Sequence, residues 1–378
     1  MAGPLAGKRI GLLTAAASRL GGGVFEAVLI QAAMIRELGG EAVILALKDR
    51  YVDEDAQRFG ASPVIAVPVI GPAQIGFAPR LLDQILAQDL DCLHLNGIWM
   101  YPSRAAHLWA RRTGRPYIVS THGMLNPWIT ARGRWKKALA RRGYERASWR
   151  AATILHALTA VEAQNITAET GRGDIAIVPN PAPDPGFPPT VPDAPRVIYI
   201  GRIHPSKNLM ALIEGWRCAA RPDDAKLILA GWGDPAHVAA LRAAVEAAGP
   251  SVAFIGPIYG ADKQELLASA RYTVLPSLTE GLPMAVLEGW AAGVPTIMTE
   301  GCNLPEGFSE GAAIDCGYDA DAIGAALSRG LGHDSSTWLG MARAAQRLAA
   351  TRYSRRTVAS QWIAIYNGER DAAAIPPC

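Results

Sequence analysis

The stretch YTVLPSLTEGLPMAVLEGWAAGVPTIM, from Tyr272 to Met298, holds the pattern that decides the fold. It begins with a short apolar run typical of a buried strand, Tyr272–Leu275, and it closes with another, Thr296–Met298. The residues between them form an apolar helix pattern, in which Pro283 suits the first position and Gly293 suits the end. Strand, helix and strand in this order predict a βαβ unit with parallel strands.

The same alternation continues along the whole chain. Short runs rich in Val and Ile alternate with longer alanine-rich helical patterns, which is typical of parallel sheets that are buried on both faces. The sequence therefore predicts an α/β fold. The other predicted strands are Arg9–Thr14, Ala42–Leu47, Cys92–Leu95, Tyr117–Ser120, Thr153–Ala157 and Ile175–Val178 in the first half, and Val197–Ile200, Leu227–Ala230 and Ala253–Ile255 in the second.

A proline-rich segment, Pro179–Pro195, separates the two halves, because its prolines disfavour both helix and sheet ladder. Near the end of the chain, Val358, Trp362 and Ile365 recur at helical spacing, so a helix over about 355–378 is expected to pack back on the first domain. The predicted organisation is a Rossmann-like first domain over 1–180, a linker over 181–195 and a Rossmann-like second domain over 196–354.

Composition excludes several classes of protein. Among the 378 residues, 50% are hydrophobic and the formal net charge is only +3, which excludes disorder as the main state and gives no general nucleic-acid signal. The five cysteines have no CxxC spacing and the seven histidines form no HExxH motif, so neither a disulfide framework nor a built-in metal site is expected.

The N-terminal segment resembles a short signal peptide, because Lys8 and Arg9 precede an apolar run. The run ends at Ser18 and leads into glycines, so we interpret it as a first strand and a loop. No apolar stretch has the length needed to span a bilayer. We expect a cytoplasmic protein, either free or peripheral at the inner face of the cytoplasmic membrane.

Two cations follow the first strand of the second domain in YIGRIHPSKNL, Tyr199–Leu209. Arg202 comes one glycine after the strand and Lys207 precedes the next helix. Two α/β domains are expected to place the carboxyl ends of their strands around a central cleft, where open α/β sheets bind ligands. A guanidinium fork and an ammonium point charge there suit the two phosphates of a diphosphate. Two loop cations in salt bridges are the alternative.

The loop before the predicted helix adds a second anion-binding feature. The helix start is expected to direct the amides of Gly281, Leu282 and Met284 into the cleft. Glu280 lies in that loop, whereas Glu288 lies inside the helix, so the two carboxylates do not share a helix face. Alternatively, Glu280 only favours the helix N-terminus, and Glu288 is solvated or paired with an arginine.

Two loops of the first domain are candidates for sugar or phosphate contacts. Gly21, Gly22 and Gly23 lie between a strand and an amphipathic helix, although they do not form the GxGxxG dinucleotide pattern. His122 follows a strand directly, which favours a function over a structural role. The motif HLNGIW supplies a tentative acceptor pocket at another strand end, with His94, Asn96 and Trp99.

A basic segment covers Ala131–Arg150, with eight Lys or Arg against one acid, Glu145. Trp135 and Trp149 lie among these cations. A basic helix with tryptophans is typical of a protein that binds an anionic membrane surface. A solvated surface is the alternative. The eight cations are at positions 132, 134, 136, 137, 141, 142, 146 and 150.

GRIHPSKN at Gly201–Asn208 and the paired glutamates of TEGLPMAVLEGWAAGVP, with the glycine loop and the strand-end histidine, resemble the retaining family 4 glycosyltransferases of GT-B fold. The resemblance is strong over Arg196–Gly311 and looser over the first domain. GCNLPEG, Gly301–Gly307, matches relatives that build bacterial surface polysaccharides.

The resemblance implies a role for each matching residue. Glu288 would hold the ribose hydroxyls of a nucleoside-diphosphate sugar, and Glu280 would contact the hydroxyls of its sugar. Arg202 and Lys207 would neutralise the leaving diphosphate, and His122 would contact the sugar near its anomeric carbon. The remaining expected donor contacts are the helix-start residues Gly281 and Leu282, the loop residues Gly22 and Gly23, and Ile258 and Tyr259 beside the base.

The predicted function is thus metal-independent sugar transfer, with no cofactor, to a lipid-linked or oligosaccharide acceptor in surface-glycan assembly. The resemblance further implies retention through same-face displacement, in which a donor phosphate oxygen takes the acceptor proton. One alternative is a GT-B-like sugar-nucleotide 2-epimerase. Another is a non-catalytic nucleotide-sugar binder, or a nucleic-acid binder that uses the basic segment, although no nucleic acid is expected.

Overall fold

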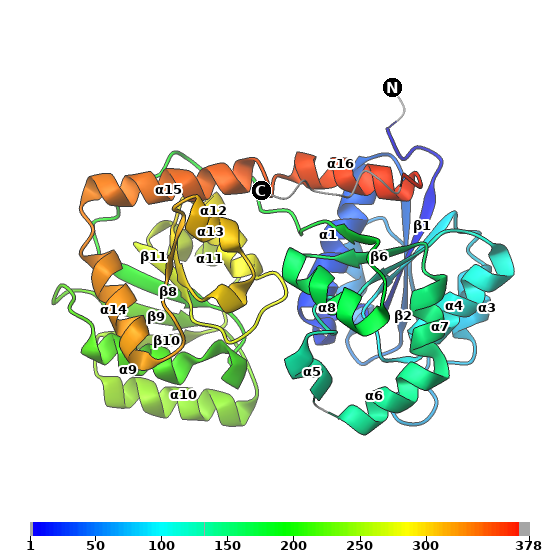
Figure 1. The fold of residues 1–378 in the computed structure, drawn as a ribbon, viewed down its shortest axis with the longest axis horizontal. Helices are drawn as coiled ribbons and strands as arrows, with labels where there is room; N and C mark the ends of the chain where they lie inside the picture. The colour runs from blue at the N-terminus through cyan, green and yellow to red at the C-terminus, as the bar shows by residue number, and fades with distance from the viewer. Residues whose placement is uncertain (1–2, 132, 370–378) are drawn as a thin grey trace. The chain divides into compact units, whose positions relative to one another are not determined.

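The computed structural model describes residues 3–131 and 133–369, which form two compact units. The first unit consists of two segments, the chain up to Pro179 and the chain from Ala359 onward, and the second unit is Asn180–Val358. Each unit is a sheet with helices packed around it (Figure 1). Helix α16 (Arg355–Tyr366) begins in the second unit and ends in the first.

The sheet of the first unit has seven parallel strands within the described residues, in the order β3-β2-β1-β4-β5-β6-β7. The strand order reverses between β1 and β4, as in doubly wound folds. Strands β4, β5 and β6 are buried along their whole length, and the buried residues include the polar side chains of His94, Asn96, Ser120 and His156. The strands are β1 (Arg9–Ala16), β2 (Glu41–Leu47), β3 (Val64–Val67), β4 (Cys92–Asn96), β5 (Tyr117–Ser120), β6 (Ile154–Ala157) and β7 (Ile175–Ile177).

The helices of the first unit cover both faces of this sheet. Helix α4 packs against α3 and α7, and α7 packs against α8. Helix α1 lies across the sheet from α4 (Figure 1). A π-helical stretch, Arg141–Glu145, joins α6 to α7. The helices are α1 (Gly23–Glu37), α2 (Val52–Asp55), α3 (Leu81–Leu86), α4 (Tyr101–Thr113), α5 (Pro127–Ala131), α6 (Arg134–Ala140), α7 (Arg146–Ala151) and α8 (Ala160–Thr170).

The second unit repeats the architecture with a six-stranded parallel sheet, as far as the described residues show, in the order β10-β9-β8-β11-β12-β13. The βαβ unit predicted over Tyr272–Met298 is confirmed, although Pro283 caps α12 and does not begin it. The strands are β8 (Arg196–Ile200), β9 (Lys226–Ala230), β10 (Val252–Gly256), β11 (Tyr272–Leu275), β12 (Thr296–Met298) and β13 (Ala313–Asp315).

The helices of the second unit pack in two groups. Helix α9 packs on α10 and α14, and α12 packs on α15. Gly215 of α9 has no room for a side chain, because a Cβ atom would lie 2.6 Å from the carbonyl oxygen of Ala320 at the start of α14. The helices are α9 (Leu209–Cys218), α10 (Pro235–Ala248), α11 (Gly260–Ala268), α12 (Met284–Ala291), α13 (Pro305–Ser309), α14 (Ala320–Leu331) and α15 (Ser335–Ala350).

Candidate functional site

Lys207 and Glu280 lie together in the second unit and form an ion pair. Lys207 ends a 3-10 turn after β8, and His204 caps that turn by accepting the N–H of Ser206 at 3.1 Å. Glu280 also accepts the hydroxyl of Ser277 at 2.6 Å. The two side chains are only 16% and 11% exposed, so water screens this pair weakly.

The loop that follows β12 holds the backbone of Glu280. The N–H of Glu280 donates to the carbonyl oxygen of Gly301 at 2.8 Å, and the side-chain amide of Asn303 donates to the carbonyl oxygen of Glu280 at 2.6 Å. A Cβ atom at position 301 would lie 2.8 to 2.9 Å from the carbonyl oxygens of Leu278 and Ser277. The GCNLPEG motif therefore fixes the Glu280 loop by close backbone contact.

The start of α12 presents unpaired amides, as the sequence predicts for an anion site. Within the described ranges, the N–H groups of Gly281, Leu282 and Met284 have no acceptor. A Cβ atom at position 281 would meet nothing within 4 Å, so the backbone there is open to a ligand. The role of these amides stays a prediction.

Arg202 lies in the same strand-end loop as Lys207 but is exposed. The hydroxyl of Tyr199 donates to the carbonyl oxygen of Arg202 at 2.8 Å and so holds the loop. Its guanidinium forms no ion pair with any residue that the structure describes, unlike the ammonium of Lys207. The alternative of a salt-bridged loop cation thus applies to Lys207 alone.

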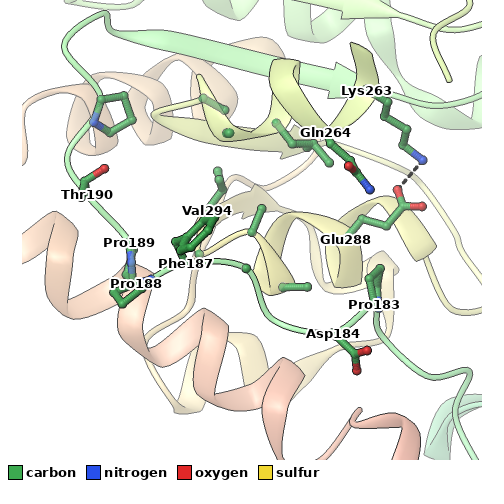
Figure 2. A pocket seen from close by; sticks show the side chains of 18 of the residues that line it. Pro183, Asp184, Phe187, Pro188, Pro189, Thr190, Lys263, Gln264, Glu288 and Val294 are labelled. Carbon is green, nitrogen blue, oxygen red and sulfur yellow. Dashed lines mark ion pairs between the residues drawn. The ribbon is translucent and has the colours of Figure 1, made fainter. Parts of the chain in front are cut away.

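Glu288 faces a cavity of about 620 Å³ in the second unit and pairs with Lys263 of α11 at 2.5 Å. Its partner is thus a lysine, where the sequence left a solvated carboxylate or an arginine as the alternatives. Figure 2 shows this ion pair at one end of the cavity, with Gln264 beside it and Pro188, Pro189 and Thr190 of the proline-rich segment on the opposite side. That segment is fastened to α12, because the N–H of Gly186 donates to the carbonyl oxygen of Ala291 at 3.0 Å.

Ile258 and Tyr259, the predicted base contacts, lie between β10 and α11. Tyr259 is exposed and Ile258 is half-buried. The next residue, Gly260, lines the same cavity as Glu288. The strand end, the start of α11 and Glu288 are therefore neighbours, and the base contact stays a prediction.

The glycine loop of the first unit, Gly21–Gly23, has free space beside its backbone at the start of α1. Gly22 adopts φ 55°, a left-handed conformation that favours glycine, and it precedes the first turn of α1. A Cβ atom at Gly22 or at Gly23 would meet nothing within 4 Å. The loop therefore has room for a ligand against the backbone.

His122 lies directly after β5 in a left-handed conformation, with φ 50°. The side-chain nitrogen of Asn96 donates to the carbonyl oxygen of His94. The side-chain oxygen of Asn96 therefore lies 2.9 Å from His122 Nε2 and accepts its N–H. This bond places the proton on Nε2 and leaves Nδ1 as an acceptor. Burial lowers the pKa of His122 to about 3, so its ring is neutral near pH 7.

The prediction that His94 and Asn96 line an acceptor pocket is wrong. His94 is 1% exposed, and its ring nitrogens lie 2.9 Å from the hydroxyl of Tyr366 and 2.6 Å from that of Ser120. Asn96 is buried and holds His122. The strand end that the sequence assigned to an acceptor is instead packed inside the first unit.

Trp99, the third residue of that motif, is half-buried at φ 78°. Its N–H donates to Glu145 at 2.5 Å, and its indole N–H donates to the carbonyl oxygen of Met124 at 3.2 Å. The cations of Lys137 and Arg141 lie over its ring. Contact with an acceptor stays a prediction for Trp99.

The basic segment runs along α6, the π-helical stretch and α7. Trp135 is 67% exposed and Leu139 is exposed beside it, whereas Trp149 is buried in the core. The expectation that Trp149 belongs to a membrane-binding surface is therefore wrong. Arg132, one of the eight cations, lies outside the described residues. The exposed cations are Arg134, Lys136, Arg142, Arg146 and Arg150. In the described ranges, no helix combines the length and the apolar character that a bilayer crossing needs.

Comparison with known proteins covers both units. Residues 22–181 match the model of the glycosyl transferase 4-like domain, and residues 194–333 match that of the glycosyl transferases of group 1. The O-antigen chain mannosyltransferase B of Escherichia coli is 28% identical over 174 residues, which are 45% of each chain. An uncharacterized glycosyltransferase of Methanocaldococcus jannaschii is 28% identical over 30% of this chain and 29% of its own. The matches thus span less than half of these curated relatives.

Solved structures share the fold across nearly the whole chain. HepE of Anabaena, in complex with UDP and glucose, superposes with a TM-score of 0.75 at 17% identity, over 95% of this chain and 99% of its own. A glycosyltransferase of Rickettsia africae superposes with a TM-score of 0.73 at 14% identity, over 97% and 99%. Each half of the chain is thus matched by a glycosyltransferase model, and the chain belongs to the family 4-like glycosyltransferases of GT-B fold.

Proposed function

We propose that this protein is a retaining, metal-independent glycosyltransferase that moves a hexose from a nucleoside-diphosphate sugar to a lipid-linked or oligosaccharide acceptor. The observation that carries the proposal is the Lys207–Glu280 pair beside the open amides at the start of α12. The similarity to an O-antigen mannosyltransferase and the fold shared with a UDP-binding protein support it. Surface-glycan assembly is the corresponding biological role.

The diphosphate is the group that leaves, so stabilising its growing negative charge is the main catalytic task. In our proposal, Lys207, Arg202 and the amides of Gly281 and Leu282 bind its oxygens. These groups are already fixed or unpaired, so little reorganisation accompanies the reaction. Cations and amides would here do what a metal ion does in other phosphate sites.

The two glutamates would recognise the two sugars of the donor. Glu288 would accept hydrogen bonds from the ribose hydroxyls, and in doing so it would exchange part of its contact with Lys263. Glu280 would accept from a hydroxyl of the transferred sugar while Lys207 turns to the phosphate. Neutral His122 would accept from the same sugar through Nδ1.

Retention would follow from displacement on one face of the sugar. The acceptor oxygen forms its bond to the anomeric carbon on the face from which the diphosphate departs, and the bond to the phosphate oxygen breaks. The acceptor proton passes to a donor phosphate oxygen. In this scheme the protein supplies position and charge, and no protein nucleophile is consumed.

We further propose that the exposed residues of α6 bring the protein to an anionic membrane. Trp135 and Leu139 supply apolar contacts, and Lys136 and the exposed arginines of the segment supply charge. A lipid-linked acceptor would then be met at the inner face of the cytoplasmic membrane.

Calorimetric titration with UDP, GDP, ADP and CMP tests the donor site. We expect one nucleoside diphosphate to bind the wild type, and we expect Glu288→Ala to weaken that binding roughly tenfold to a hundredfold, because two ribose hydrogen bonds are lost. The exposed Glu214→Ala on α9 is the matched control. If the wild type binds none of the four, the transferase proposal fails.

The reaction products distinguish a glycosyltransferase from a sugar-nucleotide 2-epimerase. With the donor identified by titration, a transferase releases the nucleoside diphosphate, whereas a 2-epimerase leaves an altered sugar nucleotide. Mass spectrometry and NMR of the spent donor distinguish the two.

A further inference from the structure

A buried carboxylate, Glu162 of α8, lies beneath the loop that carries His122. Glu162 is 3% exposed. Its Oε1 accepts the hydroxyl of Thr121 and the N–H of Gly123, each at 2.5 Å, and its Oε2 accepts the N–H of Leu158 at 2.8 Å. The carboxylate therefore engages the residues on both sides of His122.

His122 needs such support because its backbone is in the left-handed region, which a residue with a side chain seldom occupies. Conformations of this kind persist where the surrounding contacts fix them. Glu162 fixes the flanking backbone, and Asn96 fixes the ring through Nε2. Together the two contacts determine both the place of the imidazole and the nitrogen that carries its proton.

We propose that Glu162 is a positioning residue for sugar transfer, which holds His122 so that Nδ1 accepts a hydroxyl of the donor sugar. This inference rests on the proposed function. Glu162 itself touches no substrate and acts through Thr121 and Gly123.

A carboxylate suits this task better than an amide. Two backbone N–H groups and one hydroxyl approach its two oxygens. In Glu162→Gln one oxygen becomes an NH₂ group, so the N–H of either Gly123 or Leu158 would face a donor. The substitution keeps the size of the side chain and removes one acceptor.

A double-mutant cycle on the full chain tests the proposal. The assay follows release of nucleoside diphosphate from UDP-glucose or GDP-mannose, whichever donor the wild type consumes. We expect Glu162→Gln to lower kcat roughly tenfold to a hundredfold, with little change in the KM for the donor, because the bound sugar meets a misplaced ring. In a His122→Ala background, Glu162→Gln should change kcat by less than about threefold.

The cycle separates positioning from a purely structural role. If Glu162→Gln lowers kcat by the same factor in both backgrounds, Glu162 supports only the fold and the inference is overturned. If His122→Ala alone leaves kcat unchanged, the role of His122 in the proposed function fails instead. Glu169→Gln, on the same helix but paired with Arg141, is the matched control and should keep kcat.

A second readout needs no turnover. The ¹⁵N signals of the His122 ring should report a proton held on Nε2 in the wild type and a mixture of tautomers in Glu162→Gln. Identical ring signals in the two proteins would overturn the inference. If Glu162→Gln does not fold, Thr121→Val removes one of the same contacts, and Thr121→Ser should restore the wild-type signals.

Discussion

At the scale of single residues, the site of the second unit is organised by paired charges. Glu280 and Glu288 are each held by a lysine from another element, Lys207 and Lys263. Such pairs orient the carboxylates before a ligand arrives. The ammonium groups can then exchange a carboxylate oxygen for a phosphate or hydroxyl oxygen, with little change in position.

Lys207→Ala should lower kcat about a hundredfold to a thousandfold, the usual cost of removing one group that stabilises developing negative charge. The free energy of unfolding should fall by only about 1–3 kcal/mol, because Glu280 keeps the hydroxyl of Ser277. Turnover and urea denaturation measure the two effects. Lys226→Ala, an exposed lysine of the same unit, is the control. Unchanged turnover in Lys207→Ala would remove the diphosphate role of this residue.

The sequence predicted the strand-end position of Lys207 and Glu280, because parallel strands bring their carboxyl ends to one edge. It could not reveal Asn303, whose amide reaches the Glu280 loop only after β12 is paired. Glu162 carried a readable signal, since Thr159 and Glu162 have the spacing of a capping box. That pattern predicts a helix start but does not show that the carboxylate also reaches Thr121.

At the scale of elements, the sequence predicted every central strand of the two described sheets but only two of their four edge strands, β7 and β10. All predicted strands are present, whereas β3 and β13 were missed. Both lie at an edge of their sheet, where one neighbouring strand suffices and the sequence signal is short. His94 was misassigned for a related reason, because α16, from the far end of the chain, covers that side of β4.

The exposed cations of α6 and of the π-helical stretch that follows it, Lys136 and Arg142, should contribute to membrane binding. Vesicles of phosphatidylcholine and phosphatidylglycerol should bind the wild type, and Lys136→Gln with Arg142→Gln should weaken binding by about fivefold for each charge. Binding should also fall with added salt, because both cations are exposed. Sedimentation with vesicles measures the partition.

Two further variants complete that experiment. Trp135→Ser should weaken binding even in high salt, because it removes apolar contact rather than charge. Arg217→Gln, an exposed cation of α9, should bind as the wild type does. Equal binding by all the variants would identify the segment as an ordinary solvated surface.

At the scale of the whole molecule, helix α16 from the C-terminal part of the chain packs against β4 of the first unit. Tyr366 of α16 bonds to His94, and a buried chain of hydrogen bonds continues through Ser120 to His156 and the carbonyl oxygen of Val178. That carbonyl can only accept, so His156 carries its proton on Nε2 and accepts from Ser120. Ser120 in turn accepts from His94 Nε2, and Tyr366 donates to His94 Nδ1. Every partner is satisfied only when both rings are neutral.

This arrangement makes the stability of the first unit depend on pH. Burial lowers the pKa of His156 to about 4 and that of His94 well below its ordinary value. Between pH 6.5 and 4 the unfolded chain therefore binds protons that the folded unit excludes, and each histidine lowers stability by up to about 1.4 kcal/mol per pH unit on acidification. Burial raises the pKa of Glu145 to about 7, which opposes this trend over part of the range.

Comparison of variants isolates the contribution of His156. His156→Asn should have a lower free energy of unfolding than the wild type at pH 7. This difference should narrow as the pH falls from 6.5 to 4, because only the folded wild type must keep a proton off the His156 ring. Ile166→Val, an apolar truncation on α8, should keep a constant gap over the same range. Hydrogen exchange of the β6 amides follows the first unit alone. A gap that stays constant in His156→Asn would show that His156 titrates alike in the folded and unfolded chains, and would overturn the neutral network.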